Sequence, residues 1–347
     1  MTAFNPIRIG IAGYGVVGKR RSECIDRNSS LKLVAVCDQN FQGEGQLKDD
    51  VRFFQDFETL LEQDIDAIFV CMPNDVAPVV TNKALEMGRH VFCEKPPGRN
   101  LSDIQQTQEI ELANPNLRLM YGFNHRYHDS VQDALKIVQS GELGKVIHLN
   151  GIYGKSQLIT FNQSSWRTQR AIAGGGVLLD QGIHMVDLMR LFAGEFDQVH
   201  SFVSNNYWGF DVEDNAYALM RTKEGVVAML NSSATQWRHR FHLDINLEKG
   251  SLTLGGILSG SKSYGAETLR VTYADPKRDN GDPKEVVTRY NHDPSWDIEV
   301  ERFANYIAEN RIIDSCSSTD ALKTMQLIER IYTADPSWRE KYFPRTR

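Results

Sequence analysis

The sequence lacks the features that mark membrane, secreted and nucleic-acid-binding proteins. Among its 347 residues, no apolar run approaches the ~18 residues that a membrane span needs. The stretch Met1–Pro6 is too short and too polar for a signal peptide. The formal charge of −6 is opposite in sign to the basic face typical of nucleic-acid binding. We therefore expect a cytoplasmic protein with neither a membrane nor a nucleic-acid partner.

Cysteine is also scarce, and its spacing matches no zinc pattern. Three of the cysteines stand inside apolar, strand-like runs. This arrangement predicts reduced, mostly buried thiols, and we expect no metal site. The five residues are Cys24, Cys37, Cys71, Cys93 and Cys316.

The length of the chain exceeds what one hydrophobic core usually organises, which favours two domains. In the first third, short apolar runs alternate with helical patterns, which predicts βαβ units and a doubly wound parallel (Rossmann) sheet. The expected strands are Ile7–Ala12, Leu33–Cys37, Ala67–Met72, His90–Cys93 and Arg118–Phe123. The expected helices are Val16–Arg27, Phe57–Gln63, Val76–Met87 and Leu101–Ala113.

The pattern changes at about residue 145 to a series of strand-like runs separated by turn residues. This predicts an α+β domain built on a large, mostly antiparallel sheet. We place the first domain at residues 1–123 and the second at 124–347, and a return of the C-terminal helices to the first domain is open. The expected strands are Lys145–Gly154, Gln198–Asn205, Asn215–Thr222, Val226–Ala234, His239–Glu248, Ser251–Leu254 and Thr268–Tyr273. The expected helices are Gly176–Phe192, Asp297–Ala308 and Thr319–Ala334.

A glycine-rich turn follows the first expected strand and opens a helix, in the sequence Gly13-Tyr14-Gly15-Val16-Val17-Gly18. The first glycine permits a tight turn, the second lets the backbone approach a pyrophosphate, and the third allows close packing of helix and strand. Asp38 ends the second strand, where its carboxylate can bind the ribose hydroxyls and would repel a 2′-phosphate. The pattern predicts a dinucleotide site that prefers NAD to NADP. The alternatives are an ordinary glycine turn and an Asp38 that merely caps a turn.

Two further segments carry polar residues suited to chemistry. In Cys93-Glu94-Lys95-Pro96-Pro97, Lys95 follows a strand at the edge where ligands of open α/β sheets bind. One of the bonds before the two prolines could be cis, and an ordinary surface lysine is the alternative. In the helix expected after Gly174-Gly175-Gly176, Asp180, His184 and Asp187 share one face by their spacing. That stripe indicates a polar cleft, and a core histidine bonded to a carboxylate is the alternative.

Together with Asn124-His125-Arg126, these segments resemble the glucose–fructose oxidoreductase/inositol dehydrogenase (Gfo/Idh/MocA-type) family, in the family's motif order and over essentially the whole chain. The resemblance implies that Lys95, Asp180 and His184 are the catalytic set. The cofactor-binding residues that we expect are Gly13, Tyr14, Gly15, Val16, Val17, Gly18, Asp38, Pro73, Asn74, Glu94 and Lys95. Pro78 stands where many relatives have a histidine, so contacts near the nicotinamide ribose differ from theirs.

This resemblance implies a dehydrogenase that passes a hydride between NAD and a hydroxyl group of a sugar, sugar nucleotide or cyclitol. His184 is suited to remove the hydroxyl proton, and Lys95 is suited to stabilise the developing alkoxide. Which of the two takes the proton is open. The substrate contacts that we expect are Arg126, Tyr153, Trp166, Arg167, Asp180 and His184. An aromatic plate beside a guanidinium at Trp166-Arg167 suits a uronate or a nucleotide-linked sugar.

Two other functions are compatible with the same motifs. One is an NAD-dependent redox glycosidase that retains its cofactor, and the other is a dinucleotide-binding regulator without catalysis. The presence of Lys95, Asp180 and His184 argues against the regulator. The second domain is expected to bind substrate and to provide a sheet face for a homo-dimer or homo-tetramer.

Overall fold

The computed structural model describes residues 5–47, 50–157, 165–260 and 263–343. The chain forms two compact units. Unit 1 comprises Met1–Asn124 and Trp296–Lys323, and unit 2 comprises His125–Ser295 and Thr324–Arg347. The chain therefore returns to unit 1 after building most of unit 2.

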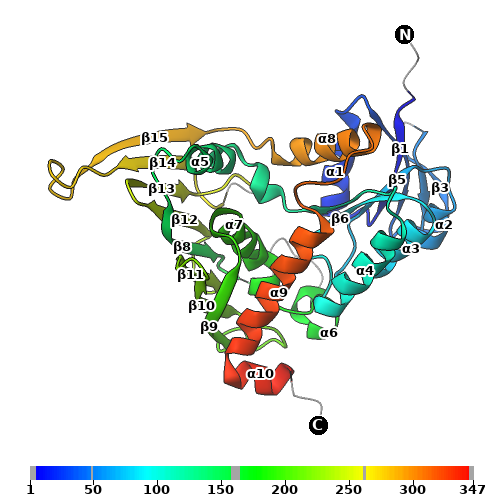
Figure 1. Ribbon diagram of the computed structural model, residues 1–347. Coiled ribbons are helices and arrows are strands. Elements are labelled where there is room, and N and C mark those ends of the chain that lie inside the picture. The colour runs from blue at the N-terminus through cyan, green and yellow to red at the C-terminus, as the bar shows by residue number, and fades with distance from the viewer. Residues whose placement is uncertain (1–4, 48–49, 158–164, 261–262, 344–347) are drawn as a thin grey trace. The chain divides into compact units, whose positions relative to one another are not determined.

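Unit 1 contains a seven-stranded sheet in the order β3-β4-β2-β1-β5-β6-β7 (Figure 1). Neighbouring strands are parallel except for β3 with β4. From β4 onward this is the strand order of a doubly wound dinucleotide-binding sheet, with its switch point between β1 and β5, so the predicted Rossmann architecture is confirmed. The strands are β1 (Ile7–Ala12), β2 (Leu31–Cys37), β3 (Gly45–Gln46), β4 (Arg52–Phe54), β5 (Ala67–Val70), β6 (His90–Glu94) and β7 (Leu119–Gly122).

The helices of unit 1 begin and end where local signals place them. Asn100 caps its helix by accepting a hydrogen bond from the Asp103 N–H at 3.1 Å. Gly88 follows its helix with a φ of 78°, a left-handed conformation that favours glycine. The helices are α1 (Val16–Asp26), α2 (Phe57–Leu61), α3 (Ala77–Glu86), α4 (Leu101–Ala113) and α8 (Ser295–Ala308), together with the start of α9 (Ser318–Ala334).

Unit 2 is built on an eight-stranded sheet in the order β15-β14-β13-β12-β8-β11-β10-β9. Its strand pairs are antiparallel except for β8 with β11, which confirms the predicted large, mostly antiparallel sheet. The strands are β8 (Val146–Gly154), β9 (Phe196–Ser204), β10 (Asn215–Thr222), β11 (Val227–Ser233), β12 (Arg240–Leu247), β13 (Gly250–Gly255), β14 (Glu267–Tyr273) and β15 (Lys284–Tyr290).

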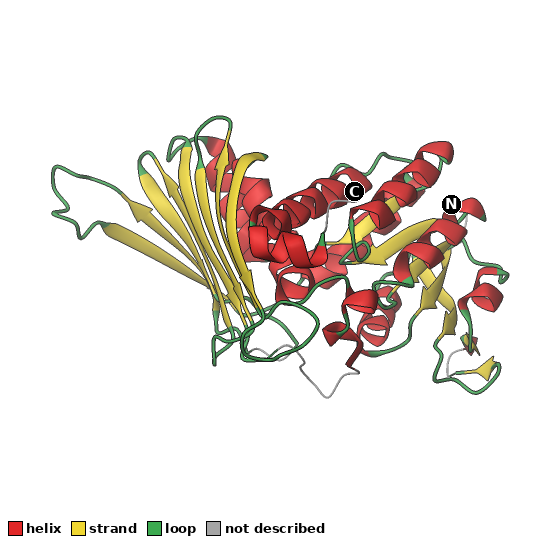
Figure 2. Ribbon diagram, turned by 90° about the horizontal axis from the view of Figure 1, so that it is seen from below, coloured by secondary structure: helices red, strands yellow, loops and turns green. Residues whose placement is uncertain are grey.

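Helices cover one face of this sheet (Figure 2). In β10, Ala216, Ala218 and Met220 are buried, whereas the alternate residues Tyr217 and Leu219 are exposed. This alternation is what a sheet with one covered face requires. The helices are α5 (Asp129–Ser140), α6 (Arg170–Ala173), α7 (Ile183–Ala193), the remainder of α9 and α10 (Pro336–Tyr342). Within the described ranges, every helix is too short or too polar to cross a membrane.

The helix expected over Gly176–Phe192 is present over residues 177–193, but its first part is not α-helical. A π-helical turn, η4 (Leu178–Gly182), precedes α7. The backbone is tightly packed here, because a Cβ added at Gly176 would lie 2.0 Å from the Glu213 carbonyl oxygen and one at Gly182 would lie 2.5 Å from Ser232 Oγ. The wider π turn breaks the spacing from which a common face for Asp180 and His184 was predicted.

Three sizeable elements of unit 2 were not predicted, namely α5, α10 and β15. Helix α5 begins after His128 and ends at Gly141, whose φ of 70° is left-handed. The spacing of Val131 and Ala134 and the glycine stop were signals for it. Strand β15 is almost fully exposed, so it has no apolar alternation to reveal it. No disulfide joins the five cysteines.

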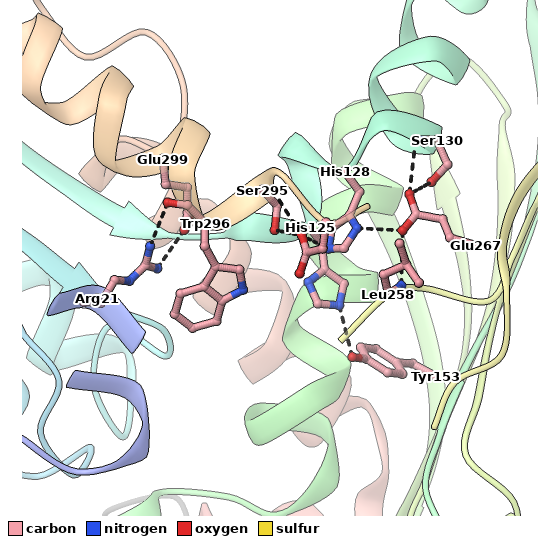
Figure 3. A network of polar contacts seen from close by, with 11 residues as sticks. Arg21, His125, His128, Ser130, Tyr153, Leu258, Glu267, Ser295, Trp296 and Glu299 are labelled. Carbon is pink, nitrogen blue, oxygen red and sulfur yellow. Dashed lines mark hydrogen bonds and ion pairs between the residues drawn. The ribbon is translucent and has the colours of Figure 1, made fainter. Parts of the chain in front are cut away.

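A buried carboxylate fixes the start of α5 against β14 (Figure 3). Glu267 accepts hydrogen bonds from the Ser130 hydroxyl at 2.6 Å and the Leu258 N–H at 3.1 Å, and its Oε2 lies 2.8 Å from His128 Nδ1. Burial by itself would raise the pKa of Glu267. The contact with His128 and the hydrogen bond from Ser130 outweigh that effect, so the pKa lies below the usual 4.5 of a glutamate.

We expect Glu267→Gln to destabilise the protein by about 1.5–3 kcal/mol at pH 7, because it removes the charge from these hydrogen bonds. The folded-state pKa is depressed, so the stabilisation is present above pH 4.5 and is lost as the pH falls through the folded value. Urea unfolding of wild type and variant should therefore give free-energy differences that shrink below pH 4.5. Glu224→Gln, at an exposed turn, is the control. A difference that stays constant with pH contradicts the assignment.

Candidate functional site

The glycine turn of unit 1 is shaped so that only glycine fits at two of its positions. Gly13 has a φ of 90°, and a Cβ added there would lie 2.4 Å from the Cys71 carbonyl oxygen. A Cβ at Gly18 would lie 2.0 Å from the Gly13 carbonyl oxygen. The turn therefore lies tight against β5, and α1 packs closely on the turn.

The middle glycine faces open space. A Cβ added at Gly15 would meet no described atom within 4 Å. Gly15 is the N-cap of α1, and no described side chain caps the first turn of that helix. Open space beside the N–H groups at a helix N-terminus suits an anionic group. The turn thus fits a pyrophosphate, which the neighbouring Tyr14, Val16 and Val17 would flank.

Asp38 follows β2 at the same edge of the sheet. One of its carboxylate oxygens accepts the Tyr14 N–H at 2.9 Å, and the other accepts the Asn40 N–H at 3.0 Å. Asp38 therefore does cap the turn, as the alternative interpretation held. Each carboxylate oxygen has two acceptor sites, so this role leaves capacity for ribose hydroxyl groups.

The other predicted cofactor residues also stand at carboxyl ends of parallel strands. Pro73 and Asn74 follow β5, and Asn74 is buried. Glu94 ends β6, and the Lys95–Pro96 bond after it is cis. The structure thus brings the predicted set to one edge of the sheet around the switch point.

A buried guanidinium supports this edge (Figure 3). Arg21 of α1 is fully buried, and it donates to Glu94 at 2.7 Å and to Glu299 of α8 at 2.7 Å. Its guanidinium carbon lies 4.5 Å from the centroid of the Phe92 ring and 4.1 Å from that of Trp296. Arg21 therefore ties the helix of the glycine turn to the residue that precedes Lys95.

In unit 2, Asp180 lies in the π turn between two cations. Its Oδ2 is 2.9 Å from Nζ of Lys155, and its Oδ1 is 3.6 Å from Nε of Arg167. The Lys155 side chain is buried, and the Arg167 guanidinium lies 4.3 Å from the centroid of the Trp166 ring. Asp180 therefore faces two cationic side chains.

His184 is buried in α7 and stacks on a second histidine. The ring centroids of His184 and His125 are 3.7 Å apart, with an interplanar angle of 13°. Nε2 of His125 lies 3.0 Å from the Tyr153 hydroxyl. Burial raises the pKa of Tyr153 well above its usual value of 10, so the hydroxyl stays protonated.

Arg126, an expected substrate contact, pairs with Asp187. Its Nε and Nη2 donate to the two carboxylate oxygens at 2.7 and 2.6 Å, and both side chains are buried. Thr324 of α9 also donates to Asp187 at 3.2 Å. This bidentate pair joins η2 (Asn124–Tyr127) to α7, which is a structural role.

Sequence reasoning did not assign His125, Lys155, Gln181 or Tyr264 to the site. Lys155 directly follows an expected strand, and His125 stands in a motif that was singled out, so both had a signal. Tyr264 had none. Its hydroxyl bonds Gln181, which lies next to Asp180, and burial raises the pKa of Tyr264 to about 12. In the described part of the chain, no group of three or more metal-ligating side chains is placed to hold a metal ion.

Comparisons with known proteins give the family. A model of an oxidoreductase family with an NAD-binding Rossmann fold matches residues 7–123, and the GFO/IDH/MocA C-terminal domain matches residues 131–253. The chain belongs to this family. The resemblance drawn from the motifs is thereby confirmed, and residues 7–123 are the NAD-binding Rossmann domain of a Gfo/Idh/MocA oxidoreductase.

Relatives in the Gfo/Idh/MocA family match over different lengths. Levoglucosan dehydrogenase of Pseudarthrobacter phenanthrenivorans is 30% identical over 151 residues, which are 43% of this chain and 38% of that protein. The uncharacterized oxidoreductase YrbE of Bacillus subtilis is 26% identical over 327 residues, 90% of each chain. Inositol 2-dehydrogenase of Salmonella typhimurium is 24% identical over 271 residues, 74% of this chain and 76% of that protein.

A solved structure shows the same fold. Levoglucosan dehydrogenase in complex with NADH matches with a TM-score of 0.82 and 20% identity, over 96% of this chain and 98% of that chain. At 20% identity, this similarity shows the fold alone.

We expect Arg21→Met to destabilise the protein by about 3–5 kcal/mol, because it leaves Glu94 and Glu299 with uncompensated buried charge. Chemical unfolding measured by fluorescence tests this, with the exposed Lys19→Met in the same helix as the control. A loss below about 1 kcal/mol, the range of surface ion pairs, contradicts the role given to Arg21.

Proposed function

We propose that this protein is an NAD-dependent dehydrogenase that oxidises a secondary hydroxyl group of a sugar, sugar nucleotide or cyclitol. The observation that carries the proposal is the buried polar cluster of unit 2, in which Asp180 contacts Lys155 and His184 stacks on His125. Such a cluster suits a substrate rich in hydroxyl groups, and it occurs in a chain whose other unit is an NAD-binding domain. Relatives named for levoglucosan and inositol support the substrate class.

The preference for NAD over NADP is argued from Asp38. Its carboxylate lies beside the glycine turn and accepts the Tyr14 N–H. A carboxylate in this position can accept hydrogen bonds from the adenosine ribose and would repel a 2′-phosphate.

The family resemblance and the chemistry of the side chains suggest the catalytic roles. When bound, the nicotinamide accepts the hydride. His184 takes the hydroxyl proton, since a histidine with a pKa near 6.5 is suited to act as a base at neutral pH. The ammonium of Lys95 stabilises the developing alkoxide. Asp180, which faces Lys155 and Arg167, accepts a hydrogen bond from a neighbouring substrate hydroxyl.

The remaining predicted substrate contacts have different surroundings, and we assign them different roles. Trp166 and Arg167 form an aromatic plate beside a guanidinium next to Asp180, and we assign them to substrate binding. Tyr153 contacts His125, and we assign it to positioning that ring. Arg126 supports α7 through Asp187.

Binding of NADH and NADPH, followed separately by fluorescence, and a screen of sugars and cyclitols for NADH production test this function. We expect tighter binding of NADH. His184→Gln should lower kcat/KM by about 10²–10⁴-fold, the usual contribution of a general base. His292→Gln, at an exposed position before α8, is the matched control.

Poor binding of both dinucleotides would remove the basis of the proposal. Retained NADH with net cleavage of a glycoside would favour the redox glycosidase, and NADH binding without turnover would favour the regulator.

We also propose that the uncovered face of the eight-stranded sheet mediates self-association. Phe202, Leu219 and Met229 expose 78%, 49% and 46% of their surface on β9, β10 and β11. A contiguous apolar face of this kind favours a protein–protein interface. Light scattering should give the mass of a dimer or tetramer, and Phe202→Asp should raise the dissociation constant of the assembly at least about tenfold, as loss of ~1.4 kcal/mol would. The exposed Glu224→Gln is the control. A monomeric wild type is the opposite outcome.

A further inference from the structure

Unit 2 places two further histidine rings in succession next to the candidate base, His184. His125 lies between His184, stacked at 3.7 Å, and His128, whose ring centroid is 5.5 Å away in an edge-on orientation (Figure 3 shows His125 and His128). The rings of His125 and His184 are buried. Because these three ionisable rings lie so close together, the protonation of one ring affects the protonation of the next.

The stack of His125 on His184 limits how many protons the pair can hold. Two imidazolium rings at 3.7 Å repel each other strongly, and burial also disfavours each charged form. When two sites interact this strongly, the second proton binds far more weakly than the first. A neutral ring lying face to face with a charged one meets no such penalty.

The Tyr153 hydroxyl distinguishes the two stacked rings. It lies 3.0 Å from Nε2 of His125 and carries a proton, because burial raises its pKa well above 10. This hydroxyl can donate to Nε2 when that nitrogen is an acceptor, and the one proton of a neutral His125 ring then lies on Nδ1. Phe241 packs edge-on against both His125 and Tyr153 and keeps this contact apolar.

The other charged groups around the stack face partners of opposite sign. On the segment before α5, Arg126 pairs with Asp187 of α7, and His128 contacts Glu267. Asp293 lies 3.7 Å from Nε2 of His128.

On the side of β8 and the π turn, Asp180 faces Lys155 and Arg167. The nearby Tyr264 is neutral, since burial raises its pKa to about 12. What distinguishes His125 from His184 is its hydrogen bond with the Tyr153 hydroxyl.

We propose that His125 and His184 form a unit that holds one proton, in which Tyr153 keeps His125 neutral and His184 is the ring that receives the proton. His125 and Tyr153 are then positioning residues. The inference rests on the proposed function only for the source of the proton, which is the hydroxyl group of the substrate. In that step the O–H bond breaks and an N–H bond forms on His184. The C–H bond of the same carbon breaks as a C=O bond forms, and the hydride that leaves is the one that oxidised NAD would accept when bound.

Nitrogen NMR of the full-length protein labelled with [15N]histidine tests the unit without any substrate. Nine histidines are present, and spectra of His125→Gln and His184→Gln assign the two rings. As the pH falls from 8 to about 5, a range around the usual histidine pKa, we expect His184 to become the imidazolium of the stacked pair. His125 should keep the pattern of a neutral ring protonated on Nδ1. Charging of His125, of both rings or of neither overturns the proposal.

Tyr153→Phe tests the hydroxyl directly, because it removes the donor and keeps the ring. We expect His125 to lose its single tautomer and to take up a proton in the same pH range. Tyr264→Phe is the matched control, since the Tyr264 hydroxyl bonds Gln181 and its ring also contacts Tyr153. An unchanged His125 pattern in Tyr153→Phe, or an equal change in Tyr264→Phe, contradicts the role of Tyr153.

The inference and the proposed function fail in different experiments. If His184 alone takes the proton but His184→Gln retains full turnover, the base assignment fails and the one-proton unit stands. If turnover depends on His184 but both rings become charged together, the function stands and the unit fails. Where both hold, Tyr153→Phe should also move the acidic limb of kcat/KM by at least about half a pH unit, as a competing proton site requires.

Discussion

The NAD-binding unit depends on one fully buried guanidinium. Arg21 must be desolvated to occupy its position, a cost that is offset only because Glu94 and Glu299 both accept its hydrogen bonds and two aromatic rings enclose it. Those two carboxylates come from β6 and from α8, which are about 200 residues apart in the chain. The same interaction that closes the core therefore also fixes the residue preceding Lys95, so stability and the placement of a candidate catalytic group are coupled.

In unit 2, each polar side chain of the candidate site instead has a partner of its own. Asp180, His184 and Asp187 follow one another along a single segment, yet each contacts a different partner: Lys155, His125 and Arg126. The partners come from the end of β8 and from η2. The contacts of a polar residue in this unit therefore depend less on its own helix than on the strand or turn that faces it.

How far the sequence predicts the structure differs between the two units for a physical reason. Buried parallel strands are short apolar runs bounded by glycine turns, so β1 was predicted with its observed bounds. Helix α4 was also predicted with its observed bounds. The π turn at Asp180 was not, because it depends on close contacts of Gly176 and Gly182 with distant residues. For the same reason the predicted helix face could not reveal Lys155 or the ring stack. Contacts over a long sequence separation leave no local pattern.

Strand β15 forms one border of the eight-stranded sheet, and it is almost fully exposed. Such a border has backbone groups ready to pair with a strand of another molecule, which makes it a template for uncontrolled growth of the sheet. Its apolar residues Val286 and Val287 are flanked by the charged Lys284, Glu285 and Arg289. A second chain adding there would bring like charges together and bury them. The exposed charges on this border therefore act as a solubility device, because they discourage the open end of the sheet from nucleating aggregates in a crowded solution.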